Sequence, residues 1–116
     1  MAGIKRLLTS FLRYIQSFFT SVNFGDLVRN QKAQVLDVRT NKECEDFGCI
    51  QDSINIPLEN LRLELSKLDK DKPLIICCGN GMRSGLARQI LLNAGFKAVY
   101  RGGSVDGLKR KLKASA

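Results

Sequence analysis

Residues 74–84 read LIICCGNGMRS, so an apolar run leads directly into a glycine-containing loop and then into a helical pattern. The run at 74–77 is typical of a strand that is buried on both faces of a parallel sheet. A loop at 78–83 follows, and a helix is predicted from 84 to about 93. Ligands of open α/β sheets bind beyond the carboxyl ends of the strands, so this loop is the candidate site.

The alternation of strands and helices continues on both sides of this stretch. Asn41 is the expected N-cap of one helix, and Gly48 is its expected end. Strands separated by helices indicate an α/β fold in which helices cover both faces of a mainly parallel sheet. We predict further helices at 24–30, 41–47 and 58–68, further strands at 35–38, 53–56 and 98–100, and a last basic helix after the glycine pair at 102–103.

The length and composition fit one folded domain. The chain has 116 residues, of which 44% are apolar and 26% charged, as in ordinary globular proteins. It contains no histidine. This excludes His-ligated metal sites and catalytic triads built on imidazole, so the chemistry must use cysteine, arginine, carboxylates or backbone amides.

The net charge of +8 comes from the two ends of the chain. Residues 1–20 carry three cations and residues 109–113 carry four, with no acid in either segment. The rest of the sequence is nearly neutral. This distribution favours tethering or solubility over a groove for a phosphate backbone, so we expect no nucleic-acid partner.

Residues 4–19 have the pattern of an amphipathic helix, with leucines, isoleucines and phenylalanines on one face and Lys5, Arg6 and Arg13 opposite. A helix of this length with three cations does not span a bilayer, but it suits the surface of an anionic membrane. Docking on the protein core or on a second copy fits the same pattern. Peripheral membrane contact and protein docking are therefore alternative expectations for this segment.

The four cysteines are Cys44, Cys49, Cys77 and Cys78. No secretory signal is recognisable, because Arg13 interrupts the early apolar stretch, so we expect a cytoplasmic protein with free thiols. We do not expect a zinc site, because adjacent cysteines chelate one tetrahedral ion poorly. Cys44 and Cys49 are predicted to be small buried apolar side chains.

Cys78 lies where the strand at 74–77 enters the loop. Successive backbone N–H groups of a loop that leads into a helix converge on one point, where the helix N-terminus adds a positive potential. A thiolate held there is nucleophilic without a histidine. Arg83 supplies a guanidinium for an incoming oxyanion. The candidate anion-binding residues are Gly79, Asn80, Gly81, Met82, Arg83 and Ser84.

These residues belong to a larger set that resembles the rhodanese-like family over about residues 21–112. That family has a small α/β domain around a mainly parallel five-stranded sheet, so the resemblance implies this fold here. The matching segments are Val35-Leu-Asp37-Val-Arg39-Thr40, Glu43, Gly48-x-Ile50, Asn55-Ile56-Pro57, Pro73-Leu-Ile-Ile-x-Cys78-x-x-Gly81-x-Arg83-Ser84, Gly95-Phe96 and Gly102-Gly103.

The resemblance also implies a function for Cys78. In the family, the loop cysteine carries sulfane sulfur as a persulfide between a small anionic donor, such as thiosulfate, and a thiophilic acceptor. The acceptor is expected to be a thiol, a cyanide-like anion or a protein, and no metal or other cofactor is implied. Asp37 and Arg39 are expected to support the loop through hydrogen bonds and ion pairing. Residues 1–20 and 113–116 are then a basic helix and a tail outside the domain.

A cysteine-dependent phosphatase or arsenate reductase is one alternative, because Cys77-x5-Arg83-Ser84 satisfies the spacing of those enzymes. Counted from Cys77, however, Asn80 takes the third loop position, where those loops commonly need glycine. Counted from Cys78, Gly81 takes that position, which favours Cys78. Successive side chains of a strand also point to opposite faces, so only one of the two cysteines is expected to face the loop.

A non-catalytic module that recruits a membrane or a partner through residues 4–19 is the second alternative. An intact Cys78 and Arg83 argue against it. A redox switch between Cys77 and Cys78 ranks last, because a bond between adjacent cysteines is strained.

Overall fold

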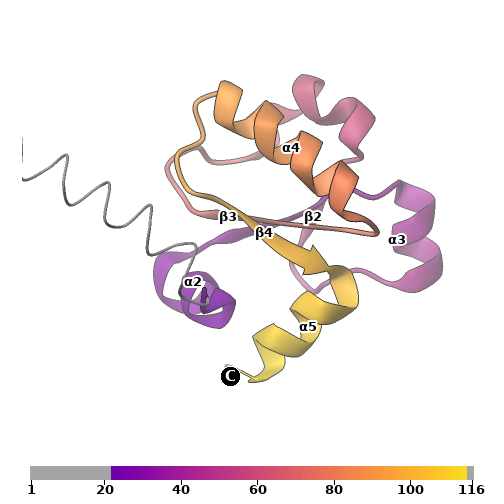
Figure 1. Cartoon of the computed structure of the whole chain (residues 1–116), viewed down its shortest axis with the longest axis vertical. Helices are drawn as coiled ribbons and strands as arrows, with labels where there is room; N and C mark the ends of the chain where they lie inside the picture. The colour runs from indigo at the N-terminus through magenta and orange to yellow at the C-terminus, as the bar shows by residue number, and fades with distance from the viewer. Residues whose placement is uncertain (1–21, 115–116) are drawn as a thin grey trace, which may run out of the picture.

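The computed structural model describes residues 22–114, so the helix predicted at 4–19 lies outside the described residues. Four parallel strands form one sheet in the order β2-β1-β3-β4 (Figure 1). The family resemblance implied five strands, and residues 22–114 contain four. The strands are β1 (Gln34–Asp37), β2 (Ile54–Asn55), β3 (Leu74–Cys78) and β4 (Val99–Ser104).

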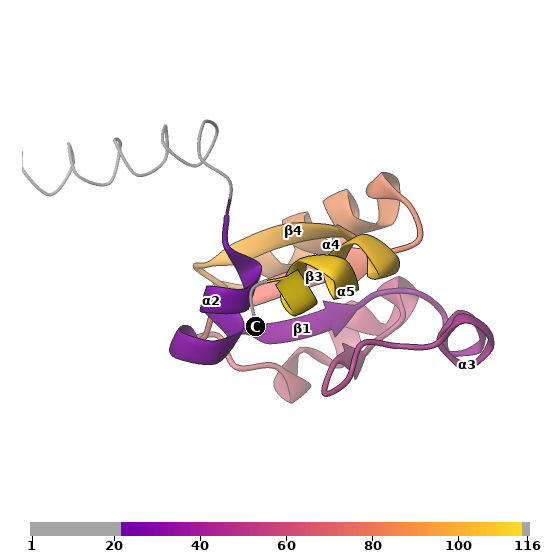
Figure 2. The same ribbon diagram turned by 90° about the horizontal axis from the view of Figure 1, so that it is seen from below.

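Helices cover both faces of the sheet, as predicted. Helices α2 and α5 lie on one face, and α4 lies on the other with two short 3-10 helices (Figures 1 and 2). Among residues 22–114, no helix has the length and apolar composition needed to cross a bilayer. The α-helices are α2 (Phe24–Gln31), α3 (Asn41–Phe47), α4 (Gly81–Asn93) and α5 (Val105–Ala114), and the 3-10 helices are η1 (Leu58–Leu63) and η2 (Leu65–Lys67).

Strand β3 divides the core into two clusters, because its side chains alternate between the two faces of the sheet. Leu74, Ile76 and Cys78 join the cluster beneath α4 and η1. Ile75 and Cys77 join the cluster beneath α2 and α5. All five side chains of the strand are buried, which confirms the prediction of a strand covered on both faces.

The single helix predicted at 58–68 is two 3-10 helices instead. Glu64 interrupts the helical path between them with φ −116° and ψ 20°. Leu58 and Leu61 are three residues apart, and three residues per turn keep them on one face. The predicted apolar face is present: Leu61 and Leu68 are buried, and Leu58 and Leu65 pack against the same core.

The beginnings of two helices differ in part from the prediction. Helix α3 starts at Asn41, as predicted, but its N-cap is Thr40 and not Asn41, because Thr40 and Glu43 form a reciprocal capping box. Helix α4 begins at Gly81, since the Asn80 side chain accepts a hydrogen bond from the Arg83 N–H and caps it. Because α4 starts early, its N-terminal end lies directly at the candidate loop.

Candidate active site

Cys78 is the last residue of β3, at the carboxyl end of the sheet. Its side chain is only 2% exposed, yet it lines a pocket of about 450 Å³ at the N-terminal end of α4. Cys78 therefore lies at the mouth of the loop, as expected from the sequence. The pocket is lined by Cys78, Gly79, Asn80, Gly81, Ser84, Arg101, Gly103 and Ser104.

The Cys78 thiol donates a hydrogen bond to the backbone carbonyl of Asn80. We expected backbone N–H groups around this sulfur, but within residues 22–114 none of them donates to it. The Arg83 N–H, which is one donor of this turn, is bound by the Asn80 side chain at 3.0 Å. The thiol form thus has a carbonyl partner, while the positive end of the α4 dipole faces the same pocket.

Cys77 faces away from the pocket that Cys78 lines. It is fully buried on the opposite face of β3, beneath α2 and α5. Burial and, to a lesser extent, the nearby Asp37 carboxylate raise the pKa of Cys77 to about 12. Cys77 is therefore a thiol at neutral pH, and of the two adjacent cysteines only Cys78 lines the pocket.

Arg83 has a different partner from the one that the loop pattern predicted. Its Nη1 and Nη2 bind the two oxygens of Glu43 at 2.5 and 2.9 Å. These bonds lower the pKa of Glu43 to about 2 and raise that of Arg83. The Arg83 side chain lines a separate hollow beside Val38 and Pro57, not the pocket of Cys78. The guanidinium is thus already neutralised on the far side of the loop.

The remaining predicted loop residues divide into two groups. Gly79, Asn80, Gly81 and Ser84 line the pocket, as expected. Met82 does not line it, and its side chain is 77% exposed. Met82 lies in the first turn of α4, and its side chain is directed to solvent.

Arg101 is a pocket residue that the sequence analysis did not single out. It lies in β4, and its guanidinium binds the Gly81 carbonyl at 2.9 Å and the Ser84 hydroxyl at 3.3 Å. It is the only charged residue among the described residues that line the pocket. In the sequence, Arg101 is marked only as a cation just before the glycine pair at 102–103. This pattern does not indicate a pocket residue unless the strand order is known.

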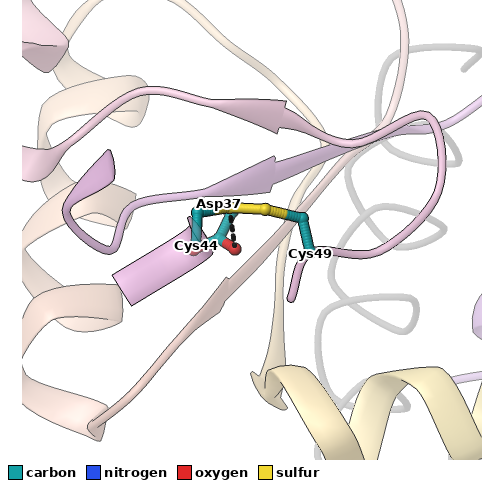
Figure 3. A group of neighbouring side chains, drawn as sticks. All are labelled: Asp37, Cys44 and Cys49. Carbon is teal, nitrogen blue, oxygen red and sulfur yellow. Dashed lines mark hydrogen bonds between the residues drawn. A yellow bond between two sulfur atoms is a disulfide. The ribbon is translucent and has the colours of Figure 1, made fainter. Parts of the chain in front are cut away.

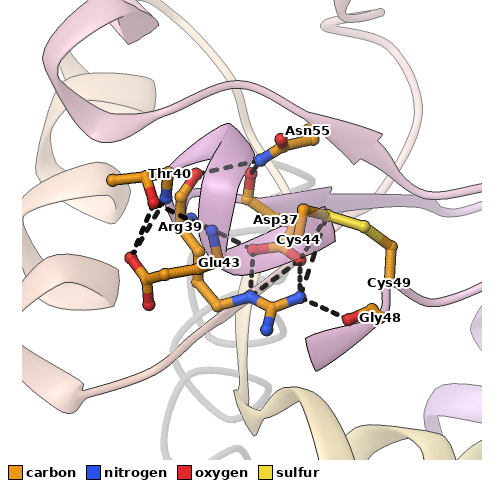
Figure 4. The surroundings of a disulfide bond; sticks show 8 residues. All are labelled: Asp37, Arg39, Thr40, Glu43, Cys44, Gly48, Cys49 and Asn55. Atoms are coloured by element: carbon orange, nitrogen blue, oxygen red, sulfur yellow. Dashed lines mark hydrogen bonds and ion pairs between the residues drawn. A yellow bond between two sulfur atoms is a disulfide. The ribbon is translucent and has the colours of Figure 1, made fainter. Parts of the chain in front are cut away.

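Asp37 and Arg39 form a buried ion pair at the end of β1 (Figure 4). The Arg39 guanidinium binds the Asp37 carboxylate, with the shortest distance 2.6 Å, and also the Gly48 carbonyl at 2.8 Å. The Asn55 amide donates to the carbonyls of both residues. Since Asp37 pairs with Cys77 across the sheet, this network supports strand β3, which carries Cys78.

Cys44 and Cys49 form a disulfide between α3 and the segment after it (Figures 3 and 4). The prediction of two free, buried thiols was therefore wrong: the Cα atoms are 5.3 Å apart, and Cys49 is exposed. The spacing of five residues brings them together because Gly48 ends the helix with φ +83°. A metal ligand set of Asp37, Cys44 and Cys49 is geometrically close, but the disulfide removes both thiolates and Arg39 already neutralises the carboxylate.

The parallel sheet with helices on both faces and a cysteine loop at its carboxyl end defines an α/β domain of the rhodanese type. The model of the rhodanese-like domain matches residues 23–109. The chain therefore belongs to the rhodanese-like family.

Relatives with names or solved structures agree with this assignment. Thiosulfate sulfurtransferase GlpE of Shewanella oneidensis is 33% identical over 94 residues, which cover 78% of this chain and 89% of that protein. The uncharacterized protein YqhL of Bacillus subtilis is 40% identical over 70 residues, 60% of this chain and 55% of YqhL, so the match spans about half the length of that relative. The crystal structure of a rhodanese-related protein from Thermoplasma volcanium superposes with a TM-score of 0.63 at 37% identity, over 78% of this chain and 91% of that one.

Proposed function

We propose that this protein is a sulfurtransferase that moves sulfane sulfur from a small anionic donor to a thiophilic acceptor through a persulfide on Cys78. The observation that carries the proposal is the position of Cys78, buried at the end of β3 but open to a pocket at the N-terminal end of α4. Relatives named thiosulfate sulfurtransferase support the reaction class.

The first step transfers sulfur to the enzyme. The Cys78 thiol gives its proton to solvent, and the thiolate attacks the outer sulfur of a donor such as thiosulfate. The new S–S bond forms as the donor's own S–S bond breaks, and sulfite leaves with the electron pair. Sulfite is a stable anion, so its departure requires no general acid.

The second step regenerates the thiolate. A nucleophilic acceptor, such as cyanide or a thiolate, attacks the outer sulfur of the persulfide, and the Cys78 thiolate leaves. With cyanide the product is thiocyanate. Because donor and acceptor react in separate half-reactions with the same sulfur, the kinetics should be ping-pong.

An anion in the pocket meets a positive potential. The hydrogen bond from the Cys78 thiol to the Asn80 carbonyl has to break before the sulfur attacks the donor. The positive end of the α4 dipole and the Arg101 guanidinium then act on an anion in the pocket. Burial beside this positive potential keeps the thiolate and its persulfide from bulk water.

Phosphatase chemistry is less compatible with the site. Phosphoryl transfer to a cysteine needs an acid that protonates the leaving group, and no carboxylate is present among the described residues that line the pocket. The alternative nucleophile, Cys77, is buried on the other face with its pKa raised to about 12.

Thiocyanate formation from thiosulfate and cyanide tests the proposal. We expect turnover by the wild type with parallel double-reciprocal lines, none by Cys78→Ser, and turnover by the matched control Cys77→Ala. Hydrolysis of p-nitrophenyl phosphate in the absence of any sulfur transfer would refute the proposal in favour of a phosphatase.

A further inference from the structure

We infer that Arg101, and not the loop residue Arg83, binds the oxyanion end of the sulfur donor and sets the preference of the site for anionic donors. The inference rests on the proposed function and adds to it a residue outside the loop. Its basis is the path of β4, the contacts of the Arg101 guanidinium and the engagement of Arg83 elsewhere.

Strand β4 directs Arg101 toward the site. Val99 packs in the core beneath α4, and Arg101, two residues further along the same strand, lies on the same face. The β3–β4 pairing shifts just after this point, from Ile76 opposite Arg101 to Cys77 opposite Gly103. This bulge places Gly102 between the two pairs and turns the end of β4 around the pocket.

Gly102 makes this path sterically available. A Cβ atom at this position would lie 2.8 Å from the Ile75 side chain and 3.1 Å from the Ile76 carbonyl oxygen. Only glycine allows so close an approach of β4 to β3. Gly102 therefore permits the path of the strand that presents Arg101.

The Arg101 guanidinium is held in place and still has donors to spare. Its Nη2 binds the Gly81 carbonyl at 2.9 Å, and its Nε binds the Ser84 hydroxyl at 3.3 Å. Both partners are neutral, so the positive charge is not cancelled. A guanidinium has five N–H donors, which leaves Nη1 available to a ligand. No carboxylate among residues 22–114 forms an ion pair with Arg101.

Arg83 lacks this availability. Both of its terminal nitrogens bind Glu43, and its Nε is buried without a hydrogen-bond partner. Arg101 is the charged residue that shares the pocket with Cys78. An oxyanion whose outer sulfur meets Cys78 would thus lie between the Arg101 guanidinium and the N-terminal end of α4.

This arrangement predicts the class of donor. A terminal sulfonate, as in thiosulfate, offers several oxygens to a guanidinium and gains charge-assisted hydrogen bonds. Methanethiosulfonate has the same reactive outer sulfur, but a methyl group replaces one oxygen and the anion carries one charge fewer. We therefore expect Arg101 to discriminate between these two donors.

The test compares Arg101→Gln with Arg110→Gln, which removes an exposed cation of α5 outside the pocket. For thiosulfate, loss of one charge-assisted contact should raise the KM of Arg101→Gln about 10- to 100-fold, with kcat within about 3-fold of wild type. The KM for methanethiosulfonate should rise less. Arg101→Lys should recover part of the loss, and Arg110→Gln should behave as wild type.

A second measurement separates this inference from the proposed function. Calorimetric titration of thiosulfate into Cys78→Ser, which cannot accept the sulfur, reports binding alone, and adding Arg101→Gln should weaken that binding by a similar factor. Turnover by the wild type with an unchanged KM and unchanged binding in the Arg101→Gln proteins overturns the inference alone. Absence of thiosulfate turnover and binding in the wild type overturns both.

Discussion

Arg83 and Glu43, separated by 40 positions in the chain, form a two-point ion pair that joins α3 to the first turn of α4. The guanidinium lies directly behind the loop at 78–83: a Cβ atom at Gly79 would be 2.6 Å from Arg83 Nη2. The loop backbone therefore rests against an arginine whose position is fixed by Glu43. The pair supports the loop from the side opposite the pocket.

The first prediction concerns the pH dependence of this pair. The hydrogen bonds from Arg83 lower the pKa of Glu43 from its ordinary value of 4.5 to about 2 in the folded protein. Its contribution to stability is therefore complete above pH 4.5 and disappears as the pH falls toward 2. Glu43→Gln should lower the free energy of unfolding by about 1 kcal/mol at pH 7, because the pair is partly exposed.

Urea unfolding of wild type and Glu43→Gln between pH 3 and 7 measures this difference. Glu45→Gln is the matched control, since Glu45 is exposed on the same helix and makes no ion pair among the described residues. If the difference in free energy of unfolding between wild type and Glu43→Gln grew as the pH fell below 4.5, the lowered pKa of Glu43 would be contradicted.

The second prediction concerns the buried pair of Asp37 and Arg39. Asp37→Asn leaves the buried Arg39 guanidinium without its counter-ion, which should cost about 3–5 kcal/mol. The control is Asp46→Asn, which breaks the exposed pair with Lys42 and should cost about 0.5 kcal/mol or less. Thermal unfolding measures both, and equal losses in the two variants would show that the Asp37 network is not a structural support.

The third prediction contrasts two glycines. Gly102→Ala should destabilise the protein by about 1–3 kcal/mol, because its Cβ would meet Ile75, Leu108 and the Ile76 carbonyl. Gly85→Ala should instead stabilise it by about 0.5–1 kcal/mol, since Gly85 lies within α4 with open space around it. Chemical denaturation measures the change in free energy of unfolding of each variant. An unchanged stability of Gly102→Ala would contradict the close approach of β3 and β4.

The fourth prediction concerns the Cys44–Cys49 disulfide. Thiol titration of the denatured, non-reduced protein should count Cys77 and Cys78 only. Reduction should lower the free energy of unfolding by about 2 kcal/mol, the value for closure of a loop this short. The double variant Cys44→Ala, Cys49→Ala should be insensitive to dithiothreitol. Four reactive thiols before reduction would show that the bond is absent in solution.

The central feature of the site was predictable from the sequence because it is local. The strand, the cysteine and the helix start lie within residues 74–84. Strand alternation placed Cys77 and Cys78 on opposite faces, and the position of Gly81 favoured Cys78. The order of strands and helices was predictable from hydrophobic periodicity, which is also a local property of the sequence. The predicted bounds of α3 are correct and only its N-cap differs, whereas α4 begins at Gly81 and not at Ser84, because the Asn80 side chain caps it.

The features that were missed depend on contacts between distant segments. The Arg83 carboxylate partner lies on α3, and Arg101 reaches the loop only because β4 is the neighbour of β3. No local pattern indicates either contact. The disulfide was missed because its formation depends on the turn at Gly48, and the free-thiol expectation rested on cellular location and not on geometry.

The most direct test of the account is the intact mass of the protein after incubation with thiosulfate and no acceptor. We predict a gain of one sulfur atom by the wild type and by Cys77→Ala, its loss on addition of cyanide, and no gain by Cys78→Ser. A gain of sulfur by Cys78→Ser, or no gain by folded wild-type protein, would contradict the claim that Cys78 carries the transferred sulfur.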